Sequence, residues 1–192
     1  MNHDNYADSY IRGILNTVKT IAVVGISPKV IRPSYFAFKY LLERGYRMIP
    51  VNPGQAGSEL LGQRVYATLA DIPEPVDMVD IFRNSEAALS VVQEALALTP
   101  KPAVIWMQLG VRNDAAAKLA EDAGLKVVMN RCPKIEYGRL SSEISWMGVN
   151  SRTLSSKRAA LGSGIQRMSL QRETLTGGAT EATVRSQGDK SS

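Results

Sequence analysis

Apolar residues recur with two different spacings through the first 130 residues of the chain. Short continuous apolar runs, typical of strands buried on both faces, occupy residues 20–25, 47–51, 78–82, 103–107 and 125–129. Residues 34–44, 85–98 and 113–123 instead follow the spacing of amphipathic helices. Gly45 and Gly124 follow two of these segments, where glycine commonly ends a helix. A further short strand is expected near residues 65–66.

Strands that alternate with helices over short connections predict a parallel sheet covered on both faces. We therefore expect an α/β fold, a Rossmann-like doubly wound parallel sheet of about five strands. In such a sheet, ligands bind outside the carboxyl ends of the strands, near the point where the strand order reverses. No repeat of a solenoid's length is present, so a solenoid is excluded.

Residues 151–192 differ in composition from the rest of the chain. They contribute +4 of the formal net charge of +5, with seven basic and three acidic residues, and contain no aromatic residue. A segment rich in Gly, Ser and Thr cannot bury enough apolar surface to offset its ordering entropy. We expect residues 1–150 to form the domain and residues 151–192 a basic, mostly disordered tail with a helical turn near residues 165–170. Without aromatic residues for base stacking, nucleic acid is not an expected partner.

One cysteine and one histidine limit the chemistry. Because Cys132 is the single cysteine, the chain has no internal disulfide. Because His3 is the single histidine, a His-rich metal cluster or a Ser-His-Asp triad in the core is excluded. We therefore expect no metal site. The first residues include Asp4 and Asp8 and lack the apolar stretch of a signal peptide, and no apolar run reaches the ~18 residues of a membrane span. These features predict a cytoplasmic protein with no membrane partner.

The predicted carboxyl ends of the strands are polar and cationic, without a carboxylate: Gly25-Ile26-Ser27, Asn52-Pro53, Phe82-Arg83, Met107-Gln108 and Asn130-Arg131-Cys132. Backbone amides at a helix start, together with Arg and Lys, suit a ligand that carries phosphate. The loop after the first strand has a single glycine, and no acidic residue follows the second strand, which argues against NAD. Lys29 and Arg32 could hold a further phosphate of the kind that coenzyme A (CoA) and NADP both carry.

Several motifs occur in order between about residue 14 and residue 140. They are Gly25-x-Ser27-x-Lys29 followed by Arg32-Pro33-Ser34, Gly45-Tyr46, Pro50-Val51-Asn52-Pro53, Asp71-Ile72-Pro73 with Val76-Asp77, Phe82-Arg83, Trp106 with Gln108-x-Gly110, and Met129-x-Arg131-Cys132-x-Lys134-x-Glu136. This set resembles the small stand-alone CoA-binding (YccU-like) proteins, whose fold is similar to the CoA-binding domain of succinyl-CoA synthetase α subunits. Asn130 stands where the family pattern has Asp.

The resemblance implies CoA or an acyl-CoA as the ligand. It implies that residues 25–27 meet the pyrophosphate and that Asn52 and Pro53 lie near the adenosine. The resemblance implies that Phe82, Arg83 and the segment from Trp106 to Gln108 line the rest of the cleft. Trp106 could stack on a base or on the pantetheine arm, but the core is the more frequent place for a Trp at a strand end. The expected cofactor-binding residues are Gly25, Ile26, Ser27, Lys29, Arg32, Ser34, Asn52, Pro53, Phe82, Arg83, Trp106 and Gln108.

No catalytic residue is predicted. CoA ligases related to this fold use a phosphorylated histidine, and His3 is expected to lie outside the fold. Cys132 is the reactive candidate, because the positive charges of Arg131 and Lys134 would lower the pKa of its thiol. The favoured interpretation, however, is an unreactive and partly buried cysteine. We expect a non-enzymatic CoA-binding or acyl-CoA-sensing module, or a module that supplies CoA to an unidentified protein partner. The alternatives are an NADP-type oxidoreductase and, less favoured, a regulator that contacts nucleic acid.

Overall fold

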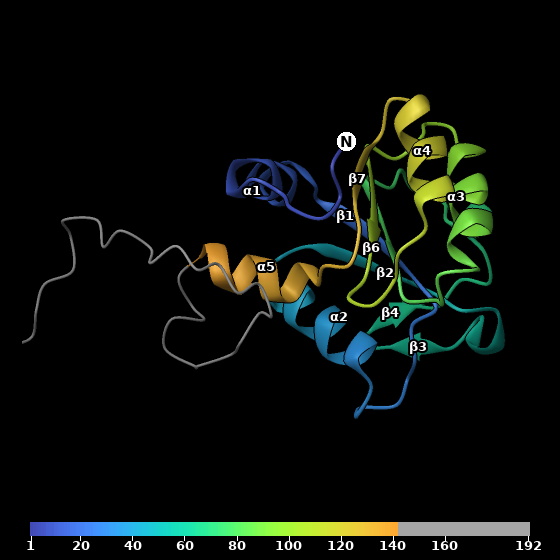
Figure 1. Cartoon of the computed structure of the whole chain (residues 1–192). Helices are drawn as coiled ribbons and strands as arrows, with labels where there is room; N and C mark the ends of the chain where they lie inside the picture. Colours follow the sequence, from blue (N-terminus) through green and yellow to red (C-terminus); the bar gives the residue numbers. More distant parts are fainter. Residues whose placement is uncertain (142–192) are drawn as a thin grey trace, which may run out of the picture. The chain divides into compact units, whose positions relative to one another are not determined.

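A five-stranded parallel sheet lies at the centre of residues 1–141, the part of the chain that the computed structural model describes (Figure 1). Its order is β2-β1-β5-β6-β7. The strands are β1 (Thr20–Val24), β2 (Arg47–Val51), β5 (Met78–Ile81), β6 (Val104–Met107) and β7 (Lys126–Val128). All pairings are parallel, which confirms the predicted α/β fold. The predicted tail and its helical turn lie outside the described residues.

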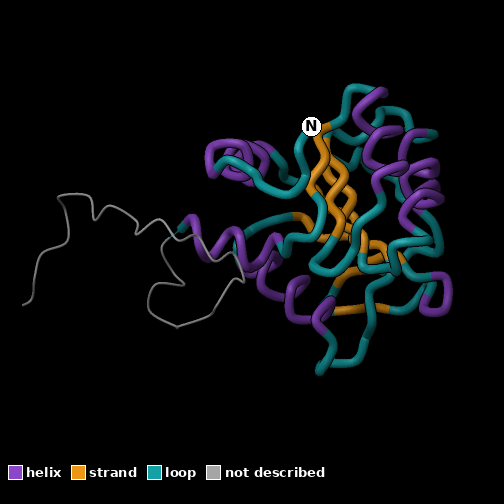
Figure 2. The backbone as a smooth tube through the Cα atoms, in the orientation of Figure 1, coloured by secondary structure: helices purple, strands orange, loops and turns teal. Residues whose placement is uncertain are grey.

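Helices cover both faces of the sheet (Figures 1 and 2). One face packs against α3 (Ala88–Leu96) and α4 (Asp114–Asp122). The other packs against α1 (Asp8–Thr17), α2 (Pro33–Glu43) and α5 (Pro133–Leu140). Because successive strand residues point to opposite faces, Val79 and Ile81 face α3 and α4, whereas Met78 and Asp80 face the other three helices.

Some elements differ from those predicted. Helices α1 and α5 were not among the predicted elements. The strand expected near residues 65–66 is a single parallel bridge between Val51 and Tyr66. The loop before it forms the short antiparallel pair β3 (Glu59–Leu60) and β4 (Gln63–Arg64). Two 3-10 turns, η1 (Pro53–Gln55) and η2 (Leu69–Asp71), complete the described chain.

The strand order reverses between β1 and β5. Strand β1 lies between β2 and β5, so the connection through α2 runs to one side of β1 and the later strands extend to the other. The loops that follow two such strands diverge and leave a crevice between them. The residues after β1 and β5, beginning at Gly25 and Phe82, therefore flank the expected ligand position. Among the described helices, none has the length and apolar character needed to cross a bilayer.

Candidate functional site

A cleft of about 550 Å³ lies at the carboxyl ends of β1, β5 and β6. It includes seven of the predicted site residues: Gly25, Ser27, Arg32, Ser34, Phe82, Arg83 and Gln108. The remaining lining residues are Pro33, Leu109, Val111, Cys132 and Ile135. Its position agrees with the general rule for doubly wound sheets. That these residues bind the ligand stays a prediction.

Gly25 allows the loops after β1 and β5 to approach each other closely. Its φ of +86° lies in the left-handed region, and a Cβ atom there would come within 2.6 Å of both Cδ of Arg83 and the backbone oxygen of Phe82. The Gly25 N–H donates to the backbone oxygen of Val51 at 2.9 Å, which fixes the loop on its other side. Only glycine fits this position without moving its neighbours.

The amino end of α2 forms another wall of the cleft. Pro33 is at the start of the helix, where its missing N–H has no intrahelical partner to lose. The Ser27 N–H donates to Oγ of Ser34 at 3.1 Å, and the Lys29 N–H donates to Oγ of Ser27 at 3.3 Å. These bonds fold the loop against the helix end, whose partial positive charge favours an anion.

Two arginines at the cleft have no acidic partner. Arg32 and Arg83 are exposed, and within residues 1–141 neither forms an ion pair. Two other cations from the carboxyl-end motifs are engaged elsewhere. Arg131 donates to the backbone oxygens of Asn130 and Asp4, and the Lys134 ammonium lies over aromatic rings of α2. The free positive charge of the cleft therefore lies near β1 and β5.

Four predicted residues lie beside the cleft rather than in its lining. Ile26 is buried, and its backbone oxygen accepts from Nδ2 of Asn52 at 2.6 Å. Oδ1 of Asn52 accepts from the Gly54 N–H at 2.9 Å. Asn52 thus connects the loop after β1 to the turn after β2. Lys29 and Pro53 are exposed on those two loops.

Trp106 belongs to the core, the more frequent place for a Trp at a strand end, and is not among the residues that line the cleft. Its side chain is fully buried, and its indole N–H donates to the backbone oxygen of Arg131 at 2.7 Å. Positions 106 and 108 share one face of β6, and position 106 lies one layer deeper. Gln108 reaches the cleft, whereas Trp106 packs below it.

A buried carboxyl group lies beneath the cleft, although none was predicted at this edge of the sheet. Asp80 is fully buried, and its carboxyl oxygens accept from Nε2 of Gln108 at 3.0 and 2.9 Å. Burial raises the pKa of Asp80 to about 8, and the hydrogen bond from Gln108 opposes this shift only partly. The signal in the sequence was a carboxylate inside the apolar run at residues 78–82.

Cys132 lines the cleft but is not an activated thiol. Burial raises its pKa to about 11, and the charge of Asp80 acts in the same direction. The backbone amides of Ile135 and Lys134 and the Lys134 charge lower the pKa by less than burial raises it. The hypothesis of a lowered thiol pKa is therefore wrong, because desolvation outweighs the neighbouring positive charge.

We expect Cys132 to react slowly with iodoacetamide in the folded protein. At pH 7.5 a thiol with this pKa has a thiolate fraction at least about 100-fold below that of an unfolded cysteine. Intact-mass spectrometry should show that the folded protein is alkylated more slowly, by about this factor, than the protein unfolded in about 8 M urea. Similar rates in the folded and unfolded protein would contradict this assignment.

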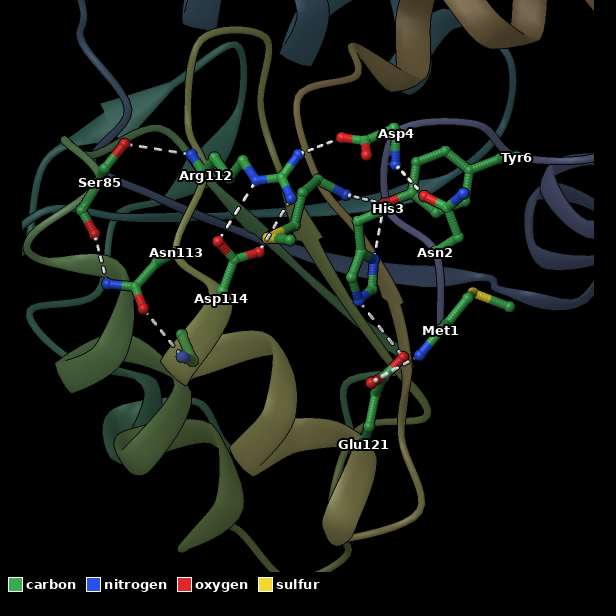
Figure 3. A network of polar contacts seen from close by, with 12 residues as sticks. Met1, Asn2, His3, Asp4, Tyr6, Ser85, Arg112, Asn113, Asp114 and Glu121 are labelled. Carbon is green, nitrogen blue, oxygen red and sulfur yellow. Dashed lines mark hydrogen bonds and ion pairs between the residues drawn. The ribbon is translucent and has the colours of Figure 1, made fainter.

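The first residues pack on the domain, so the expectation that His3 lies outside the fold is wrong (Figure 3). Nδ1 of His3 lies 2.9 Å from the Tyr6 hydroxyl, and Nε2 lies 3.4 Å from Oε1 of Glu121 on α4. The Tyr6 hydroxyl accepts from the Met129 N–H at 2.7 Å, which attaches this segment to the end of β7. His3 is not among the residues that line the cleft.

The loop after β6, which carries Leu109 and Val111, is held at both ends. Oδ1 of Asn130 accepts from the Gly110 N–H at 2.8 Å, and the Asn130 N–H donates to the Val111 oxygen at 3.1 Å. Ser85 bonds the other end of the loop through Oγ, which accepts from the Arg112 N–H (Figure 3). Asn130 has a φ of +53°, a conformation that Asn tolerates well. Asn130, where the resemblance led us to expect Asp, thus retains a side-chain acceptor.

Comparisons with known proteins agree with this geometry. A family model described as a CoA binding domain matches residues 19–138. The Bacillus subtilis protein YneT is 37% identical over 133 residues, covering 69% of this chain and 96% of YneT. A solved structure of a hypothetical protein from Pyrococcus horikoshii has a TM-score of 0.68 and 39% identity, covering 73% of this chain and 96% of that one. A Thermus thermophilus structure has a TM-score of 0.66 and 41% identity, covering 70% and 99%.

The described residues contain no group of three or more His, Cys, Asp or Glu side chains that could hold a metal ion. The features that the cleft offers to a ligand are therefore backbone amides, guanidinium groups, one buried amide–carboxyl pair and apolar walls.

Proposed function

Because the chain belongs to the CoA-binding domain family, we propose that it binds coenzyme A or an acyl-CoA in the cleft at the carboxyl ends of β1, β5 and β6. The observation that carries the proposal is the contact between Gly25 and Arg83. It brings a guanidinium that has no ion-pair partner within residues 1–141 beside the loop that leads to the amino end of α2. Guanidinium groups and helix amino ends both favour phosphate oxygens.

The exposed positions around the cleft suit the rest of the nucleotide. Lys29 and Arg32 lie on the exposed part of the loop after β1, where they can meet a peripheral phosphate. Asn52 and Pro53 follow β2, next to that loop, on the side proposed for the adenosine. In this arrangement the phosphates lie between β1 and β5 and the uncharged arm extends toward β6.

We assign the protein a binding or sensing role rather than catalysis. Cys132 has a pKa of about 11 and Asp80 one of about 8, so at neutral pH both groups are mainly protonated. Neither then acts as a ready nucleophile or base. His3 lies outside the cleft lining, which argues against a phosphohistidine relay within this chain.

Titration calorimetry with CoA, acetyl-CoA, dephospho-CoA, NADP and NAD tests the proposal. We expect CoA and acetyl-CoA to bind tightly and dephospho-CoA to bind more weakly, because it lacks the peripheral phosphate. A preference for NADP, or no binding of CoA, would overturn the proposal. Turnover of acetyl-CoA by the protein alone would overturn the non-enzymatic role.

Arg83→Ala should weaken CoA binding by about 1.5–3 kcal/mol, the range for a charge-assisted phosphate contact. Lys126→Ala is the matched control, since it removes an exposed cation at the amino end of β7, the opposite edge of the sheet. Calorimetry should show an affinity for CoA close to wild type in the control. Equal losses in the two variants would mean that overall charge, not a contact at the cleft, governs binding.

A further inference from the structure

Asp80 and Gln108 form a polar pair at the base of the cleft. The proposed phosphate site does not use this pair. Asp80 on β5 is flanked in its row of the sheet by Val23 and Trp106 and is completely buried. Gln108, which follows β6, is 4% exposed and lines the cleft above it. Nε2 of Gln108 lies within hydrogen-bond distance of both Asp80 oxygens, so the amide directs its donor end at the carboxyl group.

The other end of this amide is an acceptor without a donor from the protein. Oε1 diverges from Nε2 at the same carbon and therefore lies away from Asp80. Within residues 1–141 no N–H or O–H group is hydrogen-bonded to Oε1, and Oε1 is not among the fully buried atoms that lack a partner. Because Gln108 lines the cleft, Oε1 is accessible to a ligand there.

Asp80 determines which end of the amide faces the cleft. An ionised carboxylate only accepts hydrogen bonds, so it can pair with Nε2 but not with Oε1. The protonated form still offers its carbonyl oxygen to Nε2. Asp80 has apolar neighbours on both sides in the sheet, and within residues 1–141 no other side chain is hydrogen-bonded to it. At the ionised carboxylate, a reversed amide would direct oxygen at oxygen in a buried place, which is unfavourable. At the protonated carboxyl, a reversed amide would need the single O–H of Asp80 as its donor and would turn its own NH2 group toward the apolar walls of the cleft.

We propose that Asp80 is a positioning residue, which holds Gln108 so that Oε1 accepts a hydrogen bond from an uncharged N–H group of the ligand. The inference rests on the proposed function, since the pantetheine arm of CoA carries secondary amide N–H groups. Parallel strands lie about 4.8 Å apart, so Gln108, directly after β6, is about 10 Å across the sheet from the loop after β1. That separation places it beyond the phosphates, along the uncharged arm.

The surroundings of Gln108 favour such an arm over a second anionic group. A carbonyl oxygen above a buried carboxyl repels phosphate. The nearby cleft walls are apolar and come from Leu109, Val111 and Ile135. A secondary amide within an aliphatic chain matches both features, because its N–H pairs with Oε1 and its methylenes contact the apolar walls.

Calorimetry of the full chain with two ligands tests this role. The ligands are CoA and adenosine 3′,5′-bisphosphate, which has phosphates and adenosine but no pantetheine. Gln108→Leu should weaken CoA binding about 5- to 30-fold and leave the bisphosphate within about twofold of wild type. Asp80→Asn should weaken CoA binding by about two- to tenfold, because an amide at position 80 can pair with either end of Gln108.

The double variant separates positioning from a direct role. If Asp80 acts through Gln108, Asp80→Asn combined with Gln108→Leu should bind CoA within about twofold of Gln108→Leu alone. Fully additive losses, unchanged CoA affinity in both single variants, or equal losses for both ligands would overturn the inference. Asp80→Asn preserves size and a partner for Gln108, so the comparison of ligands holds even if Gln108→Leu does not fold. Failure of wild type to bind either ligand would instead overturn the proposed function.

Discussion

Gly25→Ala should remove most CoA binding, with a larger effect than that of Arg83→Ala. The new Cβ would lie 2.6 Å from both Cδ of Arg83 and the backbone oxygen of Phe82, so the loop after β5 must move. Movement of that loop displaces the guanidinium, and the left-handed φ of +86° strains the loop that leads to α2. We expect a loss of about 2–4 kcal/mol in binding free energy, measured by calorimetry with CoA.

Gly45→Ala is the control that isolates the contact from the backbone conformation. Gly45 has a φ of +88°, close to that of Gly25, but a Cβ there would meet no atom within 4 Å. Both variants should lose about 1–2 kcal/mol of unfolding free energy from the left-handed conformation. Only Gly25→Ala should also lose affinity for CoA. A similar loss of affinity in the two variants would show that strain, rather than the approach to Arg83, is responsible.

The sheet and the end of the cleft beside β1 and β5 were predictable because each depends on short stretches of sequence. Apolar runs rich in Val and Ile identified all five strands to within one residue at either end. Once the strands alternate with helices, parallel topology places the residues after Val24 and Ile81 at one edge of the sheet. Gly25 and Arg83 come together there for that reason.

The part of the cleft lined by α5 could not be predicted, because it depends on tertiary contacts that the local spacing of apolar residues does not indicate. Ile135 reaches the cleft through α5, a helix of eight residues that begins at Pro133 and contains Gly138, so its apolar spacing is weak. Helix α1 does contain a helical spacing in Ile11, Ile14 and Leu15, but over only ten residues. Short helices of this kind are stabilised mainly by packing on the sheet.

Depth within the sheet was the other property that the pattern did not report. Alternation along β6 puts Trp106 and Gln108 on the same face, but it does not say which of them reaches the rim. For Asp80, in contrast, the sequence pattern did predict the depth. The apolar run around it correctly predicted burial, and burial of a carboxyl group is what raises its pKa and gives Gln108 its orientation.

Asp80 should make the stability of the protein fall as pH rises from 5 to 7. Its pKa is raised by burial to about 8 in the folded state, from an ordinary value near 3.8. In this window the folded state holds one proton more at Asp80 than the unfolded state does. The free energy of unfolding therefore decreases with pH, by up to about 1.4 kcal/mol per pH unit from this group. The stabilising contribution of protonated Asp80 is complete below about pH 4 and is lost as pH rises through about 8.

Asp80→Asn separates this contribution from those of the other carboxylates, since asparagine does not titrate and has nearly the same size. Urea unfolding at pH 5, 6 and 7 should show wild type losing about 2–3 kcal/mol relative to Asp80→Asn across the window. Asp122→Asn, which changes an exposed carboxylate on α4, should give a difference from wild type that varies far less with pH. The sign of the slope is the decisive quantity. A wild-type stability that rises with pH relative to Asp80→Asn would mean that the buried carboxyl is stabilised in its charged form, and that the cleft holds a positive partner beneath Gln108.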